Sequence, residues 1–259
     1  MMRRPVAVSN WKMAMTITES RAFVRAFEPA AARYLDTVEV IICPAMTAVW
    51  AVAEALGDKR IQLAGQNVAD TVEPARMGQV SAPMLADAGC HYAVLGHWEV
   101  RRYLGDDDAA IARKLRMTLN AGLRPILLIG EPRGYSGPVE RALEQQLTGI
   151  MGQCKEDEID GAVLVYEPEG AIGAPAPATM EQVAAGCSLL RRWLRTHFGA
   201  ASEKARVMYG GSVAPEFALQ ILSCGDVDGI GATRRGRDAA SFVEIVRSVA
   251  QARGEVGDR

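Results

Sequence analysis

The stretch AVLVYEP, residues 162–168, is a short apolar run that ends in a tyrosine, a glutamate and a proline. Its residues are apolar almost without interruption, which is typical of a parallel strand covered on both faces. Seven further runs of this kind occur along the chain, and we expect a strand at each. They span residues 6–9, 38–43, 61–66, 92–95, 125–129, 206–209 and 227–230.

Stretches with helical periodicity lie between these runs. Phe23, Phe27 and Tyr34 fall on one helical face. Thr16 with Glu19, like the pair at 179 and 182, has the spacing of a capping box. Eight strands, each followed by a helix, give units of about 32 residues, the size of a βα repeat. Both a closed barrel and an open doubly wound sheet fit this count.

The position of the polar residues favours the barrel. In a (β/α)8 barrel the active site is built from the carboxyl ends of the strands. Here polar or ionisable residues follow several separate apolar runs, and the chain lacks the GxGxxG and GxxxxGK[ST] fingerprints of nucleotide-binding open sheets. We therefore expect an α/β protein with one (β/α)8 domain over residues 1–259. Its core covers about residues 5–250, and the polar tail 252–259 is expected to fray.

Composition excludes several classes of partner. The chain has 259 residues with 29 Lys and Arg against 31 Asp and Glu, a net charge of −2, which gives no electrostatic reason to expect nucleic acid or a membrane surface. No apolar run approaches the roughly 18 residues of a spanning helix, and the N-terminus does not resemble a signal peptide. Five dispersed cysteines without a CxxC pair predict buried thiols in a reducing cytoplasm and no zinc site.

The strand ends carry a resemblance to a known family. Over about residues 5–250 the chain resembles the triosephosphate isomerases, in seven segments that occur in the family's order and spacing. They are Asn10-Trp11-Lys12-Met13, Gln66-Asn67, Leu95-Gly96-His97 with Glu99, Gly130-Glu131, Tyr166-Glu167-Pro168 with Ala171-Ile172-Gly173, Tyr209-Gly210-Gly211-Ser212-Val213, and Asp226-Val227-Asp228-Gly229.

This resemblance implies a TIM barrel that is usually a homodimer and a glycolytic and gluconeogenic enzyme. It implies aldose–ketose isomerisation between D-glyceraldehyde 3-phosphate and dihydroxyacetone phosphate through an enediolate. It also implies that the reaction needs neither a metal nor an organic cofactor.

Glu167 and His97 are the expected proton-transfer residues. Isomerisation needs a base that moves a proton between adjacent carbons, and a carboxylate in a dry pocket has its pKa raised toward the working pH. Glu167 fits this role, and Pro168 would serve as the hinge of a lid. Without the residues around it, Glu167 would be interpreted as a strand-end glutamate in a surface salt bridge. His97 is the expected electrophile. Triosephosphate isomerase is the standard example of a neutral histidine, its pKa lowered by a helix N-terminus, that polarises the carbonyl.

Lys12 is the expected fixed positive charge. It would stabilise the phosphate and the developing enediolate. Asn10 lies one side-chain alternation away and would either hold Lys12 and His97 or contact the substrate. By resemblance, Glu99 is the ion-pair partner of Lys12.

Backbone N–H groups are the expected anion ligands. Gly210, Gly211 and Ser212 form a turn whose N–H groups can face an anion beside a helix start, although a plain strand-to-helix turn explains them as well. Gly173 is a further expected contact by resemblance. After the eighth strand the family has a glycine pair, whereas this chain has Thr233 and Arg234, followed by Arg235; we expect an arginine to take over part of the phosphate grip.

Further departures from the family surround the expected site. Gly170 replaces a tryptophan that packs the lid hinge, Trp98 replaces a serine, and Val100 replaces the first arginine of a pair. Met77 replaces a threonine in the loop that crosses the dimer interface, with Gln79 for a glutamate nearby. These changes leave two alternatives to a triose substrate: a related isomerase for another short sugar phosphate, such as a tetrulose phosphate, and a weakly active or non-catalytic barrel.

Overall fold

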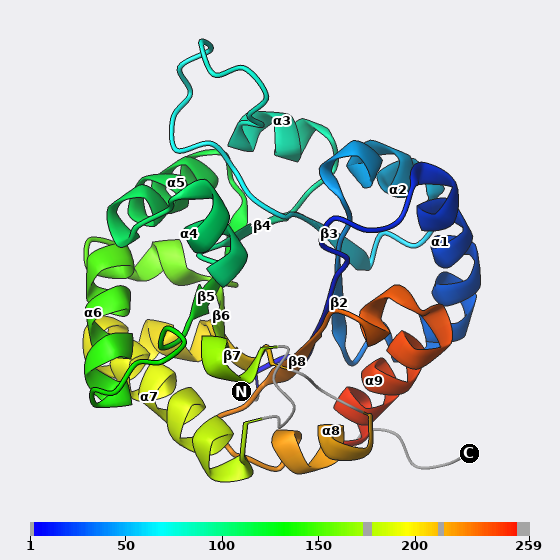
Figure 1. Cartoon of the computed structure of the whole chain (residues 1–259). Coiled ribbons are helices and arrows are strands. Elements are labelled where there is room, and N and C mark those ends of the chain that lie inside the picture. Colours follow the sequence, from blue (N-terminus) through cyan, green and yellow to red (C-terminus); the bar gives the residue numbers. More distant parts are fainter. Residues whose placement is uncertain (1–2, 173–177, 212–214, 253–259) are drawn as a thin grey trace.

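A closed ring of eight parallel strands forms the centre of the protein, and helices surround it (Figure 1). The computed structural model describes residues 3–172, 178–211 and 215–252. The strands follow chain order around the ring. They are β1 (Val6–Asn10), β2 (Glu39–Cys43), β3 (Ile61–Gly65), β4 (Tyr92–Leu95), β5 (Arg124–Ile129), β6 (Val163–Tyr166), β7 (Arg206–Tyr209) and β8 (Gly229–Ala232). The expected (β/α)8 barrel is confirmed.

The ring closes because β1 pairs with both β2 and β8. Val6 is opposite Glu39 on one side and Gly229 on the other. Side chains alternate along each strand, so Val6 and Val8 belong to the cluster inside the barrel while Ala7 belongs to the larger core between barrel and helices. Both faces are therefore dry, which explains why the strands are apolar almost throughout.

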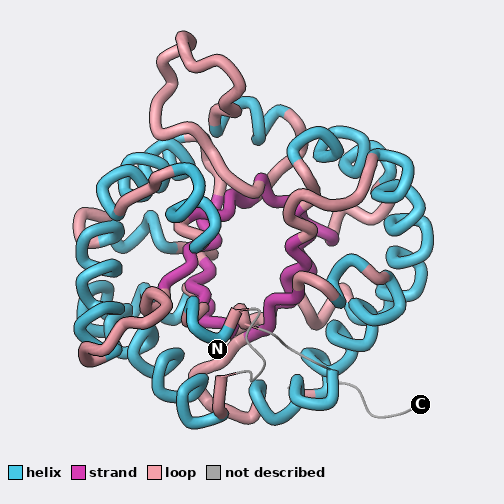
Figure 2. Tube along the Cα trace, in the orientation of Figure 1, coloured by secondary structure: helices cyan, strands magenta, loops and turns pink. Residues whose placement is uncertain are grey.

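The helices surround the ring of strands (Figure 2). Helices such as α1, α6 and α7 bury one apolar face in the core, whereas α4 has no buried residue. The capping boxes at Thr16 and Thr179 are present and begin α1 and α7. Several short 3-10 turns connect the main elements. The helices are α1 (Ile17–Ala31), α2 (Val49–Ala55), α3 (Ala82–Asp87), α4 (Trp98–Leu104), α5 (Asp108–Asn120), α6 (Val139–Met151), α7 (Met180–Phe198), α8 (Pro215–Leu222) and α9 (Ala239–Gln251).

The structure differs from the predicted elements in two places. The last strand begins at Gly229 instead of residue 227. The Asp228 backbone already donates to Val207 O at 2.6 Å and accepts from Val6 N at 3.0 Å, and its carboxylate also accepts the Val207 N–H at 2.9 Å beside Arg191. Two helices, α4 and α5, follow β4 instead of one. Residues 253–259 of the predicted fraying tail lie outside the described part of the chain.

One long connection, residues 66–81, projects from the barrel beside α3 (Figure 1). Its base is anchored: Ala69 N donates to Val80 O at 2.8 Å, and the Lys114 ammonium donates to Asn67 Oδ1 at 3.0 Å. Met77 near its tip is fully exposed. The loop therefore presents an apolar tip on a fixed base.

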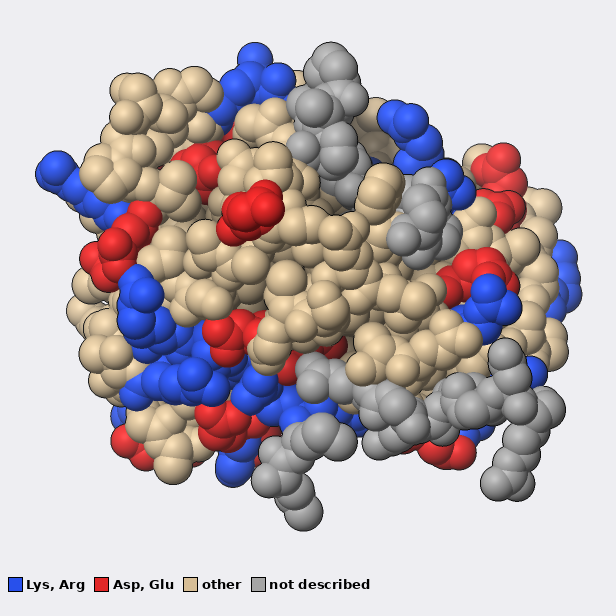
Figure 3. All heavy atoms as spheres, turned by 90° about the horizontal axis from the view of Figure 1, so that it is seen from below, with Lys and Arg blue, Asp and Glu red and all other residues tan. Residues whose placement is uncertain are grey.

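Charge on the outer helices is mixed. On the face shown in Figure 3, Lys and Arg side chains lie next to Asp and Glu side chains instead of forming a separate basic region. Many of them pair, such as Arg195 with Glu203 at 3.4 Å. In the part of the chain that the structure describes, no helix is both long and apolar enough to cross a bilayer.

Candidate active site

Three of the predicted site residues meet at the carboxyl ends of the strands. Lys12 follows β1, His97 follows β4 and Glu167 follows β6. His97 Nε2 lies 3.6 Å from Glu167 Oε2, and the Lys12 ammonium lies 2.8 Å from Glu99 Oε1. The ion pair expected for Lys12 from the family resemblance is therefore present. His97 and Glu167 are buried, while Lys12 is partly accessible.

The backbone of Lys12 is held in a strained conformation. Its φ is 52°, in the left-handed region that residues with a side chain rarely adopt. Asn10 Oδ1 accepts the Lys12 N–H at 3.0 Å, and the Gln66 side-chain amide donates to Lys12 O at 2.9 Å. These two bonds hold the strained residue, whose side chain is also fixed by Glu99. Asn10 thus holds the Lys12 backbone, while its predicted roles towards His97 and the substrate stay predictions.

The protonation state of His97 follows from its place at the start of α4. Its Nδ1 accepts the backbone N–H of Glu99 at 3.1 Å, so the ring proton of the neutral form is on Nε2, facing Glu167. The pKa of His97 is lowered to about 4, mainly by burial and also by the Lys12 ammonium, while Glu99 opposes both effects. His97 is therefore neutral at pH 7 and offers Nε2–H as a donor.

Glu167 is positioned by tight backbone packing around β6. Its N–H donates to Ile129 O at 2.9 Å. A Cβ on Gly130 would come within 2.0 Å of the Glu167 carbonyl oxygen, and a Cβ on Gly210 would come within 2.4 Å of Val165. Glycine is needed at both positions because the neighbouring strand ends approach so closely. This packing fixes where the carboxyl group can lie.

The charge state of Glu167 is set by burial. Its pKa is raised from 4.5 to about 8, mainly because burial removes solvation; the Lys12 ammonium opposes this rise and Glu99 adds to it. A carboxyl group with a pKa near neutrality can both accept and release a proton at physiological pH. The pair of a neutral histidine and a carboxyl group with a raised pKa is typical of acid–base catalysis.

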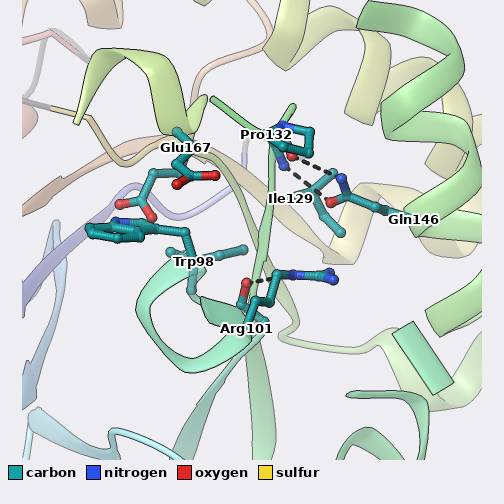
Figure 4. Close-up of a pocket in the computed structure, with 10 residues that line it drawn as sticks. Trp98, Arg101, Ile129, Pro132, Gln146 and Glu167 are labelled. Atoms are coloured by element: carbon teal, nitrogen blue, oxygen red, sulfur yellow. Dashed lines mark hydrogen bonds between the residues drawn. The ribbon is translucent and has the colours of Figure 1, made fainter. Parts of the chain in front are cut away.

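Glu167 lies between two small cavities. One, of about 30 Å³, is the mouth of the barrel, which His97 and Thr233 also line. The other, of about 80 Å³, lies between β4, β5 and β6, where Glu167 faces the Trp98 ring (Figure 4). Trp98 stacks on the His97 ring at 5.9 Å between centroids and lies 5.7 Å from the Lys12 ammonium. The tryptophan therefore shields the three residues from water on this side.

The segment after Glu167 is held by a residue that the sequence analysis missed. The Arg133 guanidinium donates to the carbonyl oxygens of Glu169 at 3.3 Å and of Ile172 at 2.8 Å. Its backbone N–H donates to the Glu169 carboxylate at 3.1 Å. Gly170 offers no side chain in this turn, and a Cβ there would meet no atom within 4 Å, so the turn is held through Glu169 and Ile172. An isolated arginine in a polar loop carries no sequence signal for such a role.

The predicted substrate-binding residues fall into three groups. Asn10, Gly210 and Thr233 line the barrel mouth, with Gly211 buried beside them. Arg234 is exposed and lines none of the cavities around Glu167, and the same holds for Arg235. Gly173 and Ser212 lie outside the described residues.

Another arginine lines the site instead. Arg237 borders an open hollow of about 550 Å³ together with Lys12, His97 and Glu99. The sequence analysis did not single it out, since it lies beyond the position of the family's glycine pair. Among residues 3–172, 178–211 and 215–252, no group of three or more His, Cys, Asp or Glu side chains is arranged to hold a metal ion.

Known proteins resemble the chain over almost its whole length. The family model "Triosephosphate isomerase" matches residues 5–249. A protein of that name from Symbiobacterium thermophilum is 38% identical over 258 residues, covering 97% of this chain and 99% of the relative. Those from Chloroflexus aurantiacus and Endomicrobium trichonymphae are 36% and 31% identical, each covering 95% of this chain and 99% of the relative.

The raised pKa of Glu167 predicts how stability depends on pH. The unfolded chain ionises this group above pH 4.5, whereas the folded protein keeps it protonated up to about pH 8. Glu167 therefore lowers the free energy of unfolding progressively over that window, by at most about 1.4 kcal/mol per pH unit. Glu167→Gln removes this cost, so its stability relative to the wild type should rise between pH 4.5 and 8 and level off above.

Urea unfolding at pH 5, 7 and 8.5 measures this difference. Glu144→Gln, an exposed substitution of the same type on α6, is the control and should show no such trend. A Glu167→Gln effect that stays constant from pH 5 to 8.5 would contradict the assigned burial.

Proposed function

The chain belongs to the triosephosphate isomerase family, and we propose that it interconverts D-glyceraldehyde 3-phosphate and dihydroxyacetone phosphate. The observation that carries this proposal is the pairing of a neutral His97 with a buried Glu167 of raised pKa, 3.6 Å apart beside Lys12. The relatives are named for the triose reaction, and no observation favours a tetrulose phosphate. Because all three reactive side chains converge on one cavity region, a purely non-catalytic barrel is the weaker alternative.

Glu167 acts as the base in this proposal. Its ionised form takes a proton from the carbon next to the substrate carbonyl, which leaves an enediolate, and then returns the proton to the neighbouring carbon. The hydroxyl proton moves in turn to the former carbonyl oxygen, so the carbonyl and hydroxyl groups exchange places. A pKa near 8 makes both steps accessible at neutral pH, since the carboxylate is basic enough to accept the proton and acidic enough to release it.

His97 and Lys12 stabilise the charge that forms on the substrate oxygens. The neutral His97 ring donates from Nε2, whose proton is fixed by the bond between Nδ1 and the Glu99 N–H. The Lys12 ammonium adds a permanent positive charge. Glu99 holds the Lys12 ammonium in place but competes with the substrate for its charge. An anionic substrate would therefore replace part of the Lys12–Glu99 ion pair.

The phosphate group is proposed to bind next to the barrel mouth. Gly211 follows β7 and is expected to present its N–H group, together with Ser212 and Gly173. The Gly210 N–H already donates to Tyr166 O at 3.0 Å, so Gly210 contributes only the close approach of its backbone. In place of the family's glycine pair we propose an arginine from residues 233–237. Arg237 has the geometric support because it borders the hollow that contains Lys12, whereas Arg234 would have to turn inward from the surface.

A homodimer completes the site in this proposal. The open hollow beside Lys12 has an apolar rim of exposed side chains, Met13, Tyr103 and Leu104. The projecting loop carries the exposed apolar residue Met77, so the loop of a second copy has the chemistry to cover this rim and exclude water from the catalytic residues. The cysteines are all free thiols, which supports a cytoplasmic location.

The role of Glu167 predicts the effect of removing its basicity. Glu167→Gln keeps the size of the side chain but cannot accept a proton. Turnover of glyceraldehyde 3-phosphate in a coupled assay should fall about 10²–10⁴-fold, the usual contribution of a general base. A variant that folds and keeps more than about a tenth of the wild-type rate would contradict the assignment.

The dimer proposal predicts that a charge at the loop tip separates the subunits. Met77→Glu places a carboxylate against the apolar rim, which costs free energy on association. Sedimentation at micromolar concentration should show a wild-type dimer and a monomeric, less active variant. Leu219→Glu, an exposed apolar position on α8, is the control and should remain dimeric. A monomeric wild type would refute the proposal.

The arginine proposal predicts a selective loss of substrate affinity. Replacing the phosphate-binding arginine with alanine should cost about 1.5–3 kcal/mol, the value of a hydrogen bond to a charged group, which is about a 10- to 150-fold rise in KM. We expect this for Arg237→Ala, with smaller effects for Arg234→Ala and Arg235→Ala. If all three variants leave KM and inhibition by phosphate unchanged, backbone groups alone hold the phosphate.

A further inference from the structure

A second hollow, of about 620 Å³, lies at the opposite end of the barrel from the catalytic residues. Its walls come from the segment before β1, from the starts of β5 and β7, and from the turns that precede β6 and β7. Five cationic side chains and two carboxylates line it. They are Arg3, Arg4, Arg124, Lys204 and Arg206, with Asp160 and Glu203.

The carboxylates of this hollow are already paired. Glu203 lies 2.5 Å from the Arg3 guanidinium, and Asp160 lies 3.4 Å from the Lys204 ammonium. Arg206 pairs with Glu39 beneath the hollow at 2.8 Å. Each of these cations is therefore largely neutralised by a neighbour.

Two of the guanidinium groups lack such a neighbour. Arg4 donates only to the carbonyl oxygens of Leu35 and Val38, at 2.6 and 3.3 Å. Arg124 donates to the Tyr92 hydroxyl at 3.4 Å. Within the described residues neither has a carboxylate within 4 Å. Glu39 and Asp160 act on Arg124 only from a longer distance, where they help to raise its pKa, so both guanidinium groups keep N–H donors that no carboxylate contacts.

Arg124 and Arg206 also converge on one oxygen atom. The Tyr92 hydroxyl donates to Glu39 at 2.7 Å and accepts from Arg206 at 3.0 Å and from Arg124 at 3.4 Å. Only 7% of the Arg206 surface is exposed, and among the described residues its Nε–H has no hydrogen-bond partner. Two guanidinium groups are thus held side by side around one hydroxyl oxygen, and their fixed positions give a bound anion two forks of N–H donors.

We propose that this hollow is an anion-binding site for a compact oxyanion with two or more negative charges, such as pyrophosphate. Arginine suits this ligand because its planar fork binds phosphate oxygens in pairs. Arg124 and Arg4 supply guanidinium groups that no carboxylate contacts, from different segments, and the paired cations around them complete the lining. The site is independent of the catalytic cavity and of the proposed isomerase reaction.

Calorimetric titration with pyrophosphate tests the proposal at low ionic strength. Lys12→Met is used as the background, because it removes the catalytic ammonium as a competing anion ligand. The Lys12→Met protein should bind one pyrophosphate per chain. The double variant that also carries Arg124→Gln should bind it at least about tenfold more weakly, as expected for loss of a charge-assisted contact. Adding Arg141→Gln, an exposed arginine on α6, should have no effect.

Two further measurements keep the test decisive. In the otherwise wild-type chain, Arg124→Gln should leave isomerase turnover unchanged. Circular dichroism verifies that this variant is folded. If Arg124→Gln does not fold, Arg4→Gln is used in its place. Absence of pyrophosphate binding to the Lys12→Met protein up to about 10 mM would overturn the proposal. Equal binding by the Lys12→Met protein with and without Arg124→Gln would overturn it as well.

Discussion

Removal of water from Glu167 and His97 is the constraint on which the rest of the site depends. Burial shifts their pKa values in opposite directions, to about 8 for the carboxyl group and about 4 for the imidazole. Each is therefore neutral near pH 7 in the absence of substrate, so the two can lie 3.6 Å apart without an ion pair between them. This pair does not stabilise the fold, because a carboxyl group buried in a dry site lowers the free energy of unfolding once the pH exceeds its ordinary pKa.

The surrounding structure makes this arrangement rigid. Asn10 and Gln66 hold the strained backbone of Lys12, and close contacts at Gly130 and Gly210 leave little room for Glu167 to move. Each support comes from a different strand end, so only a closed barrel brings them together. The helices and inner core serve the site by fixing the relative positions of these ends.

The sequence predicts the barrel well because its signals are local and repeated. Near-continuous apolar runs, capping boxes at Thr16 and Thr179 and polar residues at the strand ends all agree with the structure. The predicted last strand begins two residues before Gly229, because the apolar run locates a strand but not its first paired residue.

The prediction of the site is less complete. Lys12, His97 and Glu167 lie together as the family motifs imply, although their catalytic roles remain predictions. Arg133 and Arg237 were missed because they act through contacts with segments distant in sequence: Arg133 with the turn after β6, and Arg237 with the hollow beside Lys12. A polar loop residue gives no periodic signal, so only the fold identifies such contacts.

The most direct test of this account is a titration of the two buried groups by nuclear magnetic resonance in the substrate-free protein. Carboxyl-labelled glutamate and ring-labelled histidine report each group separately, with Glu167→Gln and a substitution of His97 to assign the signals. The account predicts that Glu167 titrates at about pH 8 and that His97 stays neutral down to about pH 4, with its proton on Nε2. Titration of Glu167 near 4.5 and of His97 near 6.5, their ordinary values, would contradict it.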